Sequence, residues 1–372
     1  MPIAQQTDQL STRDKHVKLP YPFLRDEFLD ALETSRSVGK SSGWSPIHIH
    51  LEDQAGGGFM PLYLKTHSMG EYVFDYVWAN AYHHHGFNYY PKLLSAIPFT
   101  PSAGPRTRHH KSLDGQQSKL FLEKVYEKSD IYNASSWHLL FPDDSSVDAF
   151  AGLNLLHRFG VQYHWFNDGF KTFDDFLAKC NSRKRKMIRR ERSQIKAQNI
   201  ETETLFGRDI TPEIWNFFYH LYQLTYAKRN GSNGYLTSKF FEQIGNSMPG
   251  QIAMAVARID HKPIACALYF YDSTTLYGRY WGSIREFNYL HFELCYYSGI
   301  ELSIAMGLQR FDAGAQGEHK IIRGFEPRKT HSLHWIKHPD FRDAIKHFLR
   351  EEVVAIDHHI KEANKLLPFR QT

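Results

Sequence analysis

One pattern of predicted elements occurs twice in the chain, about two hundred residues apart. Residues 22–65 predict a helix ("PFLRDEFLDALETS"), an alternating strand, a glycine turn and a second strand. Residues 250–282 predict three strands joined by short turns, followed by a long apolar helix and the strand "LQRFDAG". "FNYY" follows the first hairpin and "FNYL" follows the second. The repeated order predicts an α/β protein built from two similar units.

The length of the chain also favours two domains. Its 372 residues exceed what a single hydrophobic core of ordinary size organises. We expect a disordered polar lead over residues 1–20, an N-terminal domain over 21–165 and a C-terminal domain over 166–372. The C-terminal domain ends in a predicted amphipathic helix, "DAIKHFLREEVVAIDHHIKEANKLL".

Composition excludes several classes of protein. Hydrophobic residues make up 42% and charged residues 23%, which is typical of globular proteins and not of disordered chains. No apolar run approaches the ~20 residues of a membrane-spanning helix, and the N-terminus lacks an apolar signal core. Cys180, Cys266 and Cys295 have no paired spacing, which argues against a disulfide framework or a zinc site. We therefore expect a cytoplasmic protein.

The positive charge is concentrated in one predicted helix. The net charge is +5, whereas "SRKRKMIRRER" (residues 182–192) alone holds seven Lys/Arg and one Glu. Helical spacing aligns several of these side chains, which suits the phosphates of a nucleotide, RNA or lipid head group. A solvated helix face is the alternative interpretation. The candidate phosphate- or RNA-binding residues are Arg183, Lys186, Arg189 and Arg190.

The segment "FDAGAQGEHKIIRGFEP" (residues 311–327) places many reactive groups among glycines. Glu318 and His319 are candidates for proton transfer, and Lys320 and Arg323 are candidates for holding an anion. A glycine-rich connection with solvated charges is the alternative. Asp312 and Gln316 are further candidates for substrate binding.

The predicted helix "LHFELCYYSGIELSI" contains a carboxylate among apolar neighbours. Burial would raise the pKa of Glu293 and make it a usable base. The alternative is a buried structural glutamate paired with Arg279 or Arg323. His291 lies in the same helix, and Tyr280 and Trp281 precede it.

No sequence motif indicates a bound metal or cofactor. "YHHHGF" and "RHHK" contain consecutive histidines, which do not easily converge on one ion, and no carboxylate is suitably spaced. The chain also lacks a Walker loop, a Gly-x-Ser-x-Gly elbow and a Rossmann glycine fingerprint. We expect neither a metal nor a tightly bound cofactor.

The assembled motifs resemble a known family. "SVGKSSGW", "PLYLKTHSMGEYVFD", "YYPKLLSAIPFTPSAGPR", "SRKRKMIRRER", "LYGRYWG", "LHFELCYYSGIE" and "GAQGEHKIIRGFEP" are similar to the FemAB-like predicted N-acyltransferases of peptidoglycan biosynthesis/recognition, in the GNAT superfamily. The resemblance covers roughly residues 22–350. It implies two tandem GNAT-like domains, each a mixed sheet flanked by helices.

The resemblance also bears on the donor and the acceptor. Fem-type relatives move an amino acid from aminoacyl-tRNA to a cell-wall precursor amine, and they carry a Lys-Arg-Gly-Phe-like turn. Here Arg323, Gly324 and Phe325 match that turn, but Ile322 replaces the Lys, which weakens the case for a wall-precursor acceptor. Acetyl-CoA users of the superfamily have a glycine cluster where this chain has only Gly282, which weakens the case for acyl-CoA. The donor stays open between aminoacyl-tRNA and acyl-CoA.

These observations predict an N-acyltransferase that moves an acyl or aminoacyl group from an activated donor to a small-molecule or peptide amine. The expected base is Glu318 or His319, with Glu293 as the next candidate. Backbone amides of residues 314–317 would stabilise the oxyanion, and Trp281 and Tyr280 would wall the acyl pocket. We expect tRNA as a possible donor and no DNA partner. The alternatives are a non-catalytic muropeptide- or RNA-binding module on a transferase-like fold, and an RNA-binding protein that uses the basic helix.

Overall fold

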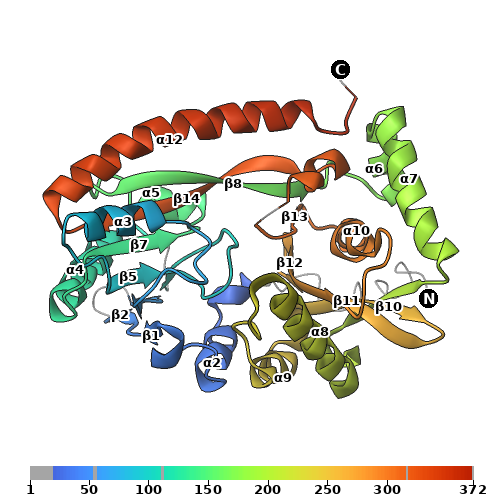
Figure 1. The fold of residues 1–372 in the computed structure, drawn as a ribbon, viewed down its shortest axis with the longest axis horizontal. Helices are drawn as coiled ribbons and strands as arrows, with labels where there is room; N and C mark the ends of the chain where they lie inside the picture. Colours follow the sequence, from blue (N-terminus) through green and yellow to red (C-terminus); the bar gives the residue numbers. More distant parts are fainter. Residues whose placement is uncertain (1–19, 53–56, 110–112, 316, 371–372) are drawn as a thin grey trace. The chain divides into compact units, whose positions relative to one another are not determined.

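The computed structural model describes residues 20–52, 57–109, 113–315 and 317–370, and the predicted disordered lead lies outside them except for Pro20. The chain forms two compact units (Figure 1). Among the described residues, unit 1 comprises 20–31, 162–328 and 362–370, and unit 2 comprises 32–161 and 329–361. Each unit is therefore assembled from segments that are far apart in the sequence.

Unit 1 is built on a mixed sheet with the strand order β8-β13-β12-β11-β10-β9. The β12–β13 pair is parallel, and the β8–β13, β11–β12, β10–β11 and β9–β10 pairs are antiparallel. The strands are β8 (Leu156–Phe166, of which residues 162–166 belong to this unit), β9 (Glu201–Phe206), β10 (Ile252–Ile259), β11 (Lys262–Tyr271), β12 (Thr275–Ser283) and β13 (Arg310–Asp312).

The helices of unit 1 cover both faces of this sheet. Gly282 of β12 lies against Leu221 of α8, and Gly299 of α11 lies against Phe311 of β13. Because both faces are covered, β10 and β11 are almost continuously apolar and buried. The helices are α2 (Asp26–Thr34), α6 (Phe173–Lys179), α7 (Ser182–Ala197), α8 (Pro212–Asn230), α9 (Ser238–Ser247), α10 (Leu290–Phe292), α11 (Ser298–Ala305), the π-helix η6 (Glu293–Tyr297) and the 3₁₀-helix η7 (Glu318–Arg323).

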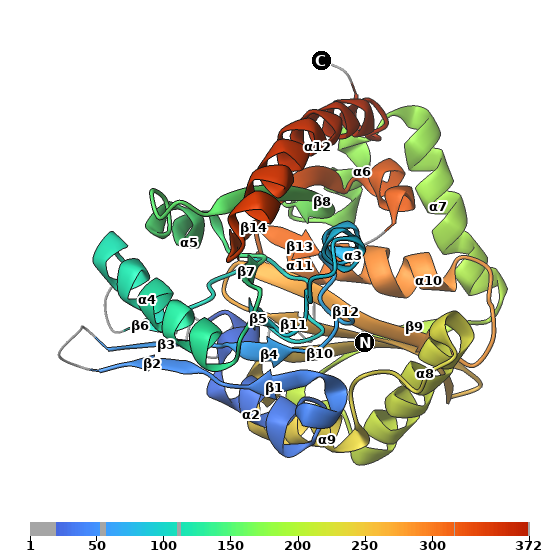
Figure 2. The ribbon, with the colours of Figure 1, turned by 60° about the vertical axis from the view of Figure 1, so that its left-hand side comes forward.

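Unit 2 has a main sheet with the strand order β1-β4-β5-β7-β14 and a second, three-stranded sheet with the order β2-β3-β6. Helix α4 packs against β2, β5 and β7 (Figure 2). The strands are β1 (Trp44–Pro46), β2 (Ile49–Leu51), β3 (Gly58–Met60), β4 (Tyr63–Lys65), β5 (Lys92–Ser95), β6 (Arg108–His109), β7 (Ser136–Leu140) and β14 (Glu326–Ile336). The helices are α3 (Tyr76–His84), α4 (Gly115–Ile131), α5 (Asp144–Ala149) and α12 (Pro339–Lys365).

Local sequence signals account for several of these elements. Thr172 forms a capping box with Asp175 at the start of α6, and the Asn181 side chain accepts a hydrogen bond from the Lys184 N–H at the start of α7. The apolar stripe of α12 buries Ile345 and Leu349 in a cluster with Trp78 and Tyr82. Helix boundaries and buried faces thus follow from capping residues and apolar spacing.

The predicted α/β class, with mixed sheets flanked by helices, is confirmed. The predicted junction at residue 165 falls within β8, and residues 329–361 group with unit 2. The domain boundaries predicted from the sequence (21–165 and 166–372) stay predictions. The assignment of each predicted domain as GNAT-like also stays a prediction.

Close packing of α11 on β13 makes Gly299 sensitive to substitution. A Cβ atom at this residue would overlap the Phe311 ring, so Gly299→Ala should destabilise unit 1 by ~1–3 kcal/mol. The matched control is Gly250→Ala, because a Cβ atom at Gly250 meets no other atom within 4 Å. Chemical denaturation should give a lower midpoint for Gly299→Ala alone. Equal midpoints for both variants would contradict this packing.

Candidate functional site

The parallel strands β12 and β13 pair only over a short length. Their register joins Thr275–Tyr277 to Arg310–Asp312, and β12 continues to Ser283 beside β11. A register shift between Leu268 and Tyr269 of β11 makes Arg279 an extra residue in β12. Ligands of α/β proteins commonly bind beyond the carboxyl ends of parallel strands, where neighbouring connections diverge. The groups around these strand ends form the candidate site of unit 1.

Aromatic and imidazole rings gather beside these strand ends. The Trp281 ring lies 5.2 Å from the His291 ring, which lies 5.3 Å from the Tyr296 ring and 6.0 Å from the His319 ring. The Tyr296 hydroxyl lies 2.7 Å from Nε2 of His319. The structure thus brings together three residues that the sequence singled out, and it adds Tyr296 from the π-helix η6, a type of helix often found at functional sites.

His319 is exposed and has a lowered pKa. Burial of part of the ring lowers this pKa below 6.5, and the cations Arg323 and Lys320 lower it further. The imidazole is therefore neutral at neutral pH and can accept a proton. The pKa of His291 falls to about 3 because of burial and the nearby His319, so this second ring is also neutral.

Lys320 fixes the glycine segment that follows β13. Its Nζ atom is buried and donates a hydrogen bond of 2.6 Å to the Gly314 carbonyl oxygen. Burial lowers the pKa of Lys320 to about 8, and Asp312 opposes that shift. Asp312 accepts a 2.9 Å hydrogen bond from the Gly314 N–H. The strand end and η7 are therefore joined by a buried ammonium close to a carboxylate.

Arg323 is committed to contacts within the protein. It donates to Glu191 through Nε at 3.1 Å and Nη2 at 2.7 Å, and to the His319 carbonyl oxygen through Nη1 at 2.7 Å. Its guanidinium also stacks on Phe292, 3.5 Å from the ring centroid, and Nε contacts the Tyr297 hydroxyl at 3.1 Å. These contacts hold η7 against α7 and η6, which makes Arg323 a positioning residue.

Glu293 is a buried carboxylate paired with an arginine of the basic helix. Arg192 donates to both of its oxygens, through Nη2 at 2.8 Å and Nε at 3.1 Å, and its Nη1 donates to Glu301 at 2.6 Å. Burial raises the pKa of Glu293, and Arg192 opposes that shift. The expected partners Arg279 and Arg323 were wrong, because α7 turns Arg192 toward η6. A catalytic role for Glu293 stays a prediction.

Three candidate residues from the sequence remain: Tyr280, Glu318 and Gln316. Tyr280 lies on the other side of β12 from Trp281, in edge contact with Tyr222 of α8 at 5.4 Å and Phe241 of α9 at 6.1 Å. Glu318 is exposed at the start of η7. Gln316 lies outside the described residues.

Helix α7 has a buried face and a basic face. Ile188, Glu191 and Ile195 are buried. The four candidate phosphate-binding residues are exposed: Arg183, Lys186, Arg189 and Arg190. Arg189 forms an ion pair with Asp174 at 3.2 Å.

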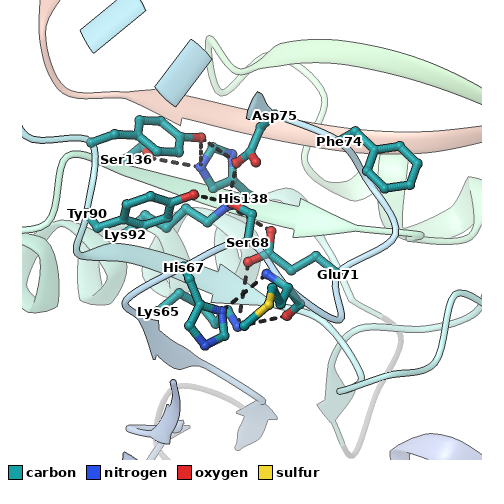
Figure 3. Close-up of polar contacts among 12 residues, drawn as sticks. Lys65, His67, Ser68, Glu71, Phe74, Asp75, Tyr90, Lys92, Ser136 and His138 are labelled. Carbon is teal, nitrogen blue, oxygen red and sulfur yellow. Dashed lines mark hydrogen bonds and ion pairs between the residues drawn. The ribbon is translucent and has the colours of Figure 1, made fainter. Parts of the chain in front are cut away.

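Sequence reasoning missed a second polar cluster, in unit 2 (Figure 3). Lys92 donates to Ser68 Oγ at 2.8 Å, to Glu71 at 2.7 Å and to Asp75. Lys65 lies 3.8 Å from Glu71, and both lysines are fully buried. The signal was present in "YLK" and "YYPKLL", where a lysine adjoins buried apolar residues, and in "GEYVFD", where two carboxylates are four residues apart.

No group of three or more His, Cys, Asp or Glu side chains suited to a metal occurs among the residues that the structure describes. Within the described ranges, no helix is both long enough and apolar enough to span a membrane. Cys180, Cys266 and Cys295 are free thiols.

Two solved structures share this fold over nearly the whole chain. FemX matches with a TM-score of 0.54 and 12% identity, over 92% of this chain and 98% of FemX. L-PGS from Bacillus licheniformis matches with a TM-score of 0.51 and 11% identity, over 90% of this chain and 99% of that protein. No curated protein gives a significant sequence match. These neighbours define the class of fold as FemX-like.

The family follows from the sequence itself. A family model described as FemAB-like, peptidoglycan biosynthesis/recognition, matches residues 4–371. The chain belongs to this FemAB-like family, and the predicted resemblance is confirmed.

The pairing of Glu293 predicts a specific loss of stability. Arg192→Met leaves a buried carboxylate without its partner and should cost ~3–5 kcal/mol at neutral pH. The pKa of Glu293 is already raised and rises further without Arg192. Acidification therefore protonates the carboxyl in the variant. The difference in stability between Arg192→Met and wild type should then become smaller. Denaturation midpoints at pH 7.5 and 5.5 measure this.

A control variant lies on the same helix. Arg189→Met removes an ion pair whose partners are 61% and 79% exposed, and it should change the midpoint little at either pH. If the difference in midpoint between Arg192→Met and wild type is the same at both pH values, the unpaired charge of Glu293 is not the cause of the lost stability.

Proposed function

We propose that this chain is an N-acyltransferase that moves an acyl or aminoacyl group from an activated donor to an amine acceptor. The observation that carries the proposal is the neutral, exposed imidazole of His319, hydrogen-bonded to Tyr296 and adjacent to the buried ammonium of Lys320. Acyl transfer to an amine uses a base that takes the proton of the amine and a positive group that stabilises the oxyanion, and His319 and Lys320 are consecutive residues of these two kinds. Membership of the FemAB-like family supports the same class of reaction.

The base has to remove a proton from the acceptor. An alkylammonium loses its proton at a reference pKa near ~10, so it becomes nucleophilic only when a base accepts that proton. His319 is exposed and neutral, whereas Glu293 is enclosed by Arg192. We therefore assign the base to His319, and we keep the exposed carboxylate of Glu318 as the alternative.

Charge stabilisation is assigned to the segment between β13 and η7. The attacked carbonyl oxygen becomes negative in the tetrahedral intermediate, and preorganised donors nearby lower the barrier. Lys320 brings a buried ammonium to this segment through its contact with Gly314. Trp281 and His291 supply a flat wall beside it, which suits an acyl group.

The donor is proposed to be an aminoacyl-tRNA, with acyl-CoA as the alternative. The exposed face of α7 presents several cations along about two helical turns, and an extended polyanion matches such a row better than one pyrophosphate does. The protein is proposed to act in the cytoplasm, where charged tRNA is available.

The donor can be identified directly. Mass spectrometry of small molecules and tRNA retained by the purified protein should reveal an aminoacyl-tRNA or an acyl-CoA. The protein should then transfer a labelled acyl group from that donor to an amine with many turnovers. Stoichiometric binding without turnover would favour the non-catalytic muropeptide- or RNA-binding module instead.

Replacement of His319 tests the catalytic assignment. His319→Asn should lower kcat/KM by ~10²–10⁴-fold without loss of folding, because the side chain is exposed. The same change at His347, which is 75% exposed on α12, is the control. Loss of activity in Glu318→Gln together with an active His319→Asn would move the base to Glu318.

The pH profile of kcat/KM tests the same pair of residues. The rate should rise with pH as His319 loses its proton below pH 6.5, and it should fall as Lys320 loses its proton near pH 8. The rising limb should disappear in His319→Asn. A rising limb that persists in this variant would assign it to another group.

The contribution of the basic face of α7 to tRNA binding can be tested separately from the catalytic residues. The triple variant Arg183→Gln/Lys186→Gln/Arg190→Gln should weaken tRNA binding and reduce the salt slope of log K by ~2–3. The matched control is Lys346→Gln/Arg350→Gln/Lys361→Gln, which neutralises three exposed cations of α12. Filter binding across a salt series measures both triples, and equal slopes would exclude α7 as the tRNA contact.

A further inference from the structure

Two buried lysines face each other across neighbouring strands of unit 2. Antiparallel pairing of β4 and β5 places Lys65 directly opposite Lys92, and neither side chain is exposed. Like charges in such a pair repel each other. The segment after β4 returns Glu71 and Asp75 to this pair, so the cluster has two potential positive and two potential negative charges (Figure 3).

Fold stability does not require this arrangement. Apolar residues at 65 and 92 would complete the same two strands without removing four charged groups from water, and such replacements are often neutral or stabilising. Phe74 of the same segment points away from the cluster and is 58% exposed, whereas Glu71 and Asp75 point inward (Figure 3). The segment therefore turns its polar side chains toward the sheet.

The cluster has hydrogen-bonding capacity that its own members do not use. Lys92 uses three N–H donors on Ser68, Glu71 and Asp75. Glu71 Oε1 and Asp75 Oδ1 are buried and accept no hydrogen bond from the described residues. Lys65 Nζ lies 3.8 Å from Glu71 Oε1, which is beyond hydrogen-bonding distance. Two buried carboxylate oxygens, one of them in an ion pair with Lys65, thus have no hydrogen-bond donor within the described residues.

Lys65 has better contacts elsewhere. It donates to the Met69 carbonyl oxygen at 3.3 Å and lies over the Trp44 ring, 3.8 Å from the centroid. Thr66 and Met69 are exposed and His67 is partly exposed, so the loop that follows β4 lies at the protein surface.

We propose that this cluster is a binding site for a primary ammonium group, which donates hydrogen bonds to Glu71 Oε1 and Asp75 Oδ1. An ammonium fits because the two open atoms are acceptors and because its charge complements carboxylates. A carboxylate or phosphate ligand would be repelled by the same two oxygens. This inference stands without the proposed transferase activity, although a primary ammonium is also the form in which the proposed amine acceptor would arrive.

The ionisation of the cluster agrees with this ligand. Burial lowers the pKa of Lys65 to about 7, and Glu71 opposes that shift. Burial raises the pKa of Glu71 to about 7, against the effect of Lys92. As the pH rises through 7, Lys65 loses positive charge and Glu71 gains negative charge. A cationic ligand should therefore bind more tightly at pH 8 than at pH 6.

The test compares two cations that differ in their N–H donors. Thermal unfolding of the full chain is followed at equal ionic strength with methylammonium chloride or tetramethylammonium chloride. Methylammonium, which can donate hydrogen bonds, should raise the unfolding midpoint by about 2 °C or more above tetramethylammonium. The difference should be larger at pH 8 than at pH 6. No difference at either pH would overturn the proposal and leave the cluster a structural one.

Two variants locate the site. Glu71→Gln removes the charged acceptor and should abolish the difference between the cations, whereas Glu123→Gln on the exposed side of α4 should keep it. Lys65→Met removes the competing ammonium while Lys92 keeps its carboxylate partners, so it should preserve or enlarge the difference. If Glu71→Gln fails to fold, Lys65→Met decides alone, because a loss of the preference there overturns the assignment.

Discussion

Two adjacent residues of α7 with opposite charges hold the candidate site of unit 1 in place. Glu191 binds Arg323 of η7, and Arg192 binds Glu293 of η6. Both contacts are largely buried, so removing either partner would leave an unbalanced charge in the protein interior. The rings and the ammonium at the ends of β12 and β13 depend on these two ion pairs for their relative placement. The basic helix is therefore a structural element of the site as well as a charged surface.

The sequence predicted the secondary-structure elements better than it predicted which side chains contact each other. Apolar spacing located α12, and the run of basic residues located α7, because both signals are local. The partner of Glu293 was wrong because it lies 101 residues away, and periodicity identifies a buried face without identifying what packs on it. Strand alternation alone would have separated Tyr280 from Trp281, since neighbouring strand residues point to opposite faces.

The cluster of unit 2 escaped prediction for a different reason. Lysine is rarely buried, so a lysine at a strand end is normally taken as a surface residue. Only the register of β4 on β5 shows that Lys65 and Lys92 are opposed, and only the return of the following segment shows that carboxylates meet them. The strings that carried the family resemblance contained these residues, but their chemistry depends on tertiary contacts.

The interleaving of the two units affects how the protein is made. β14 pairs with β7 through residues 332–336, almost two hundred positions later in the chain. A ribosome completes most of unit 2 and all of the strands of unit 1 before it supplies that last partner. During synthesis the β7 edge therefore waits with unpaired backbone groups, which are open to wrong pairing. No single cut of the gene yields either unit whole, and expression of separated halves would need a rearranged chain order.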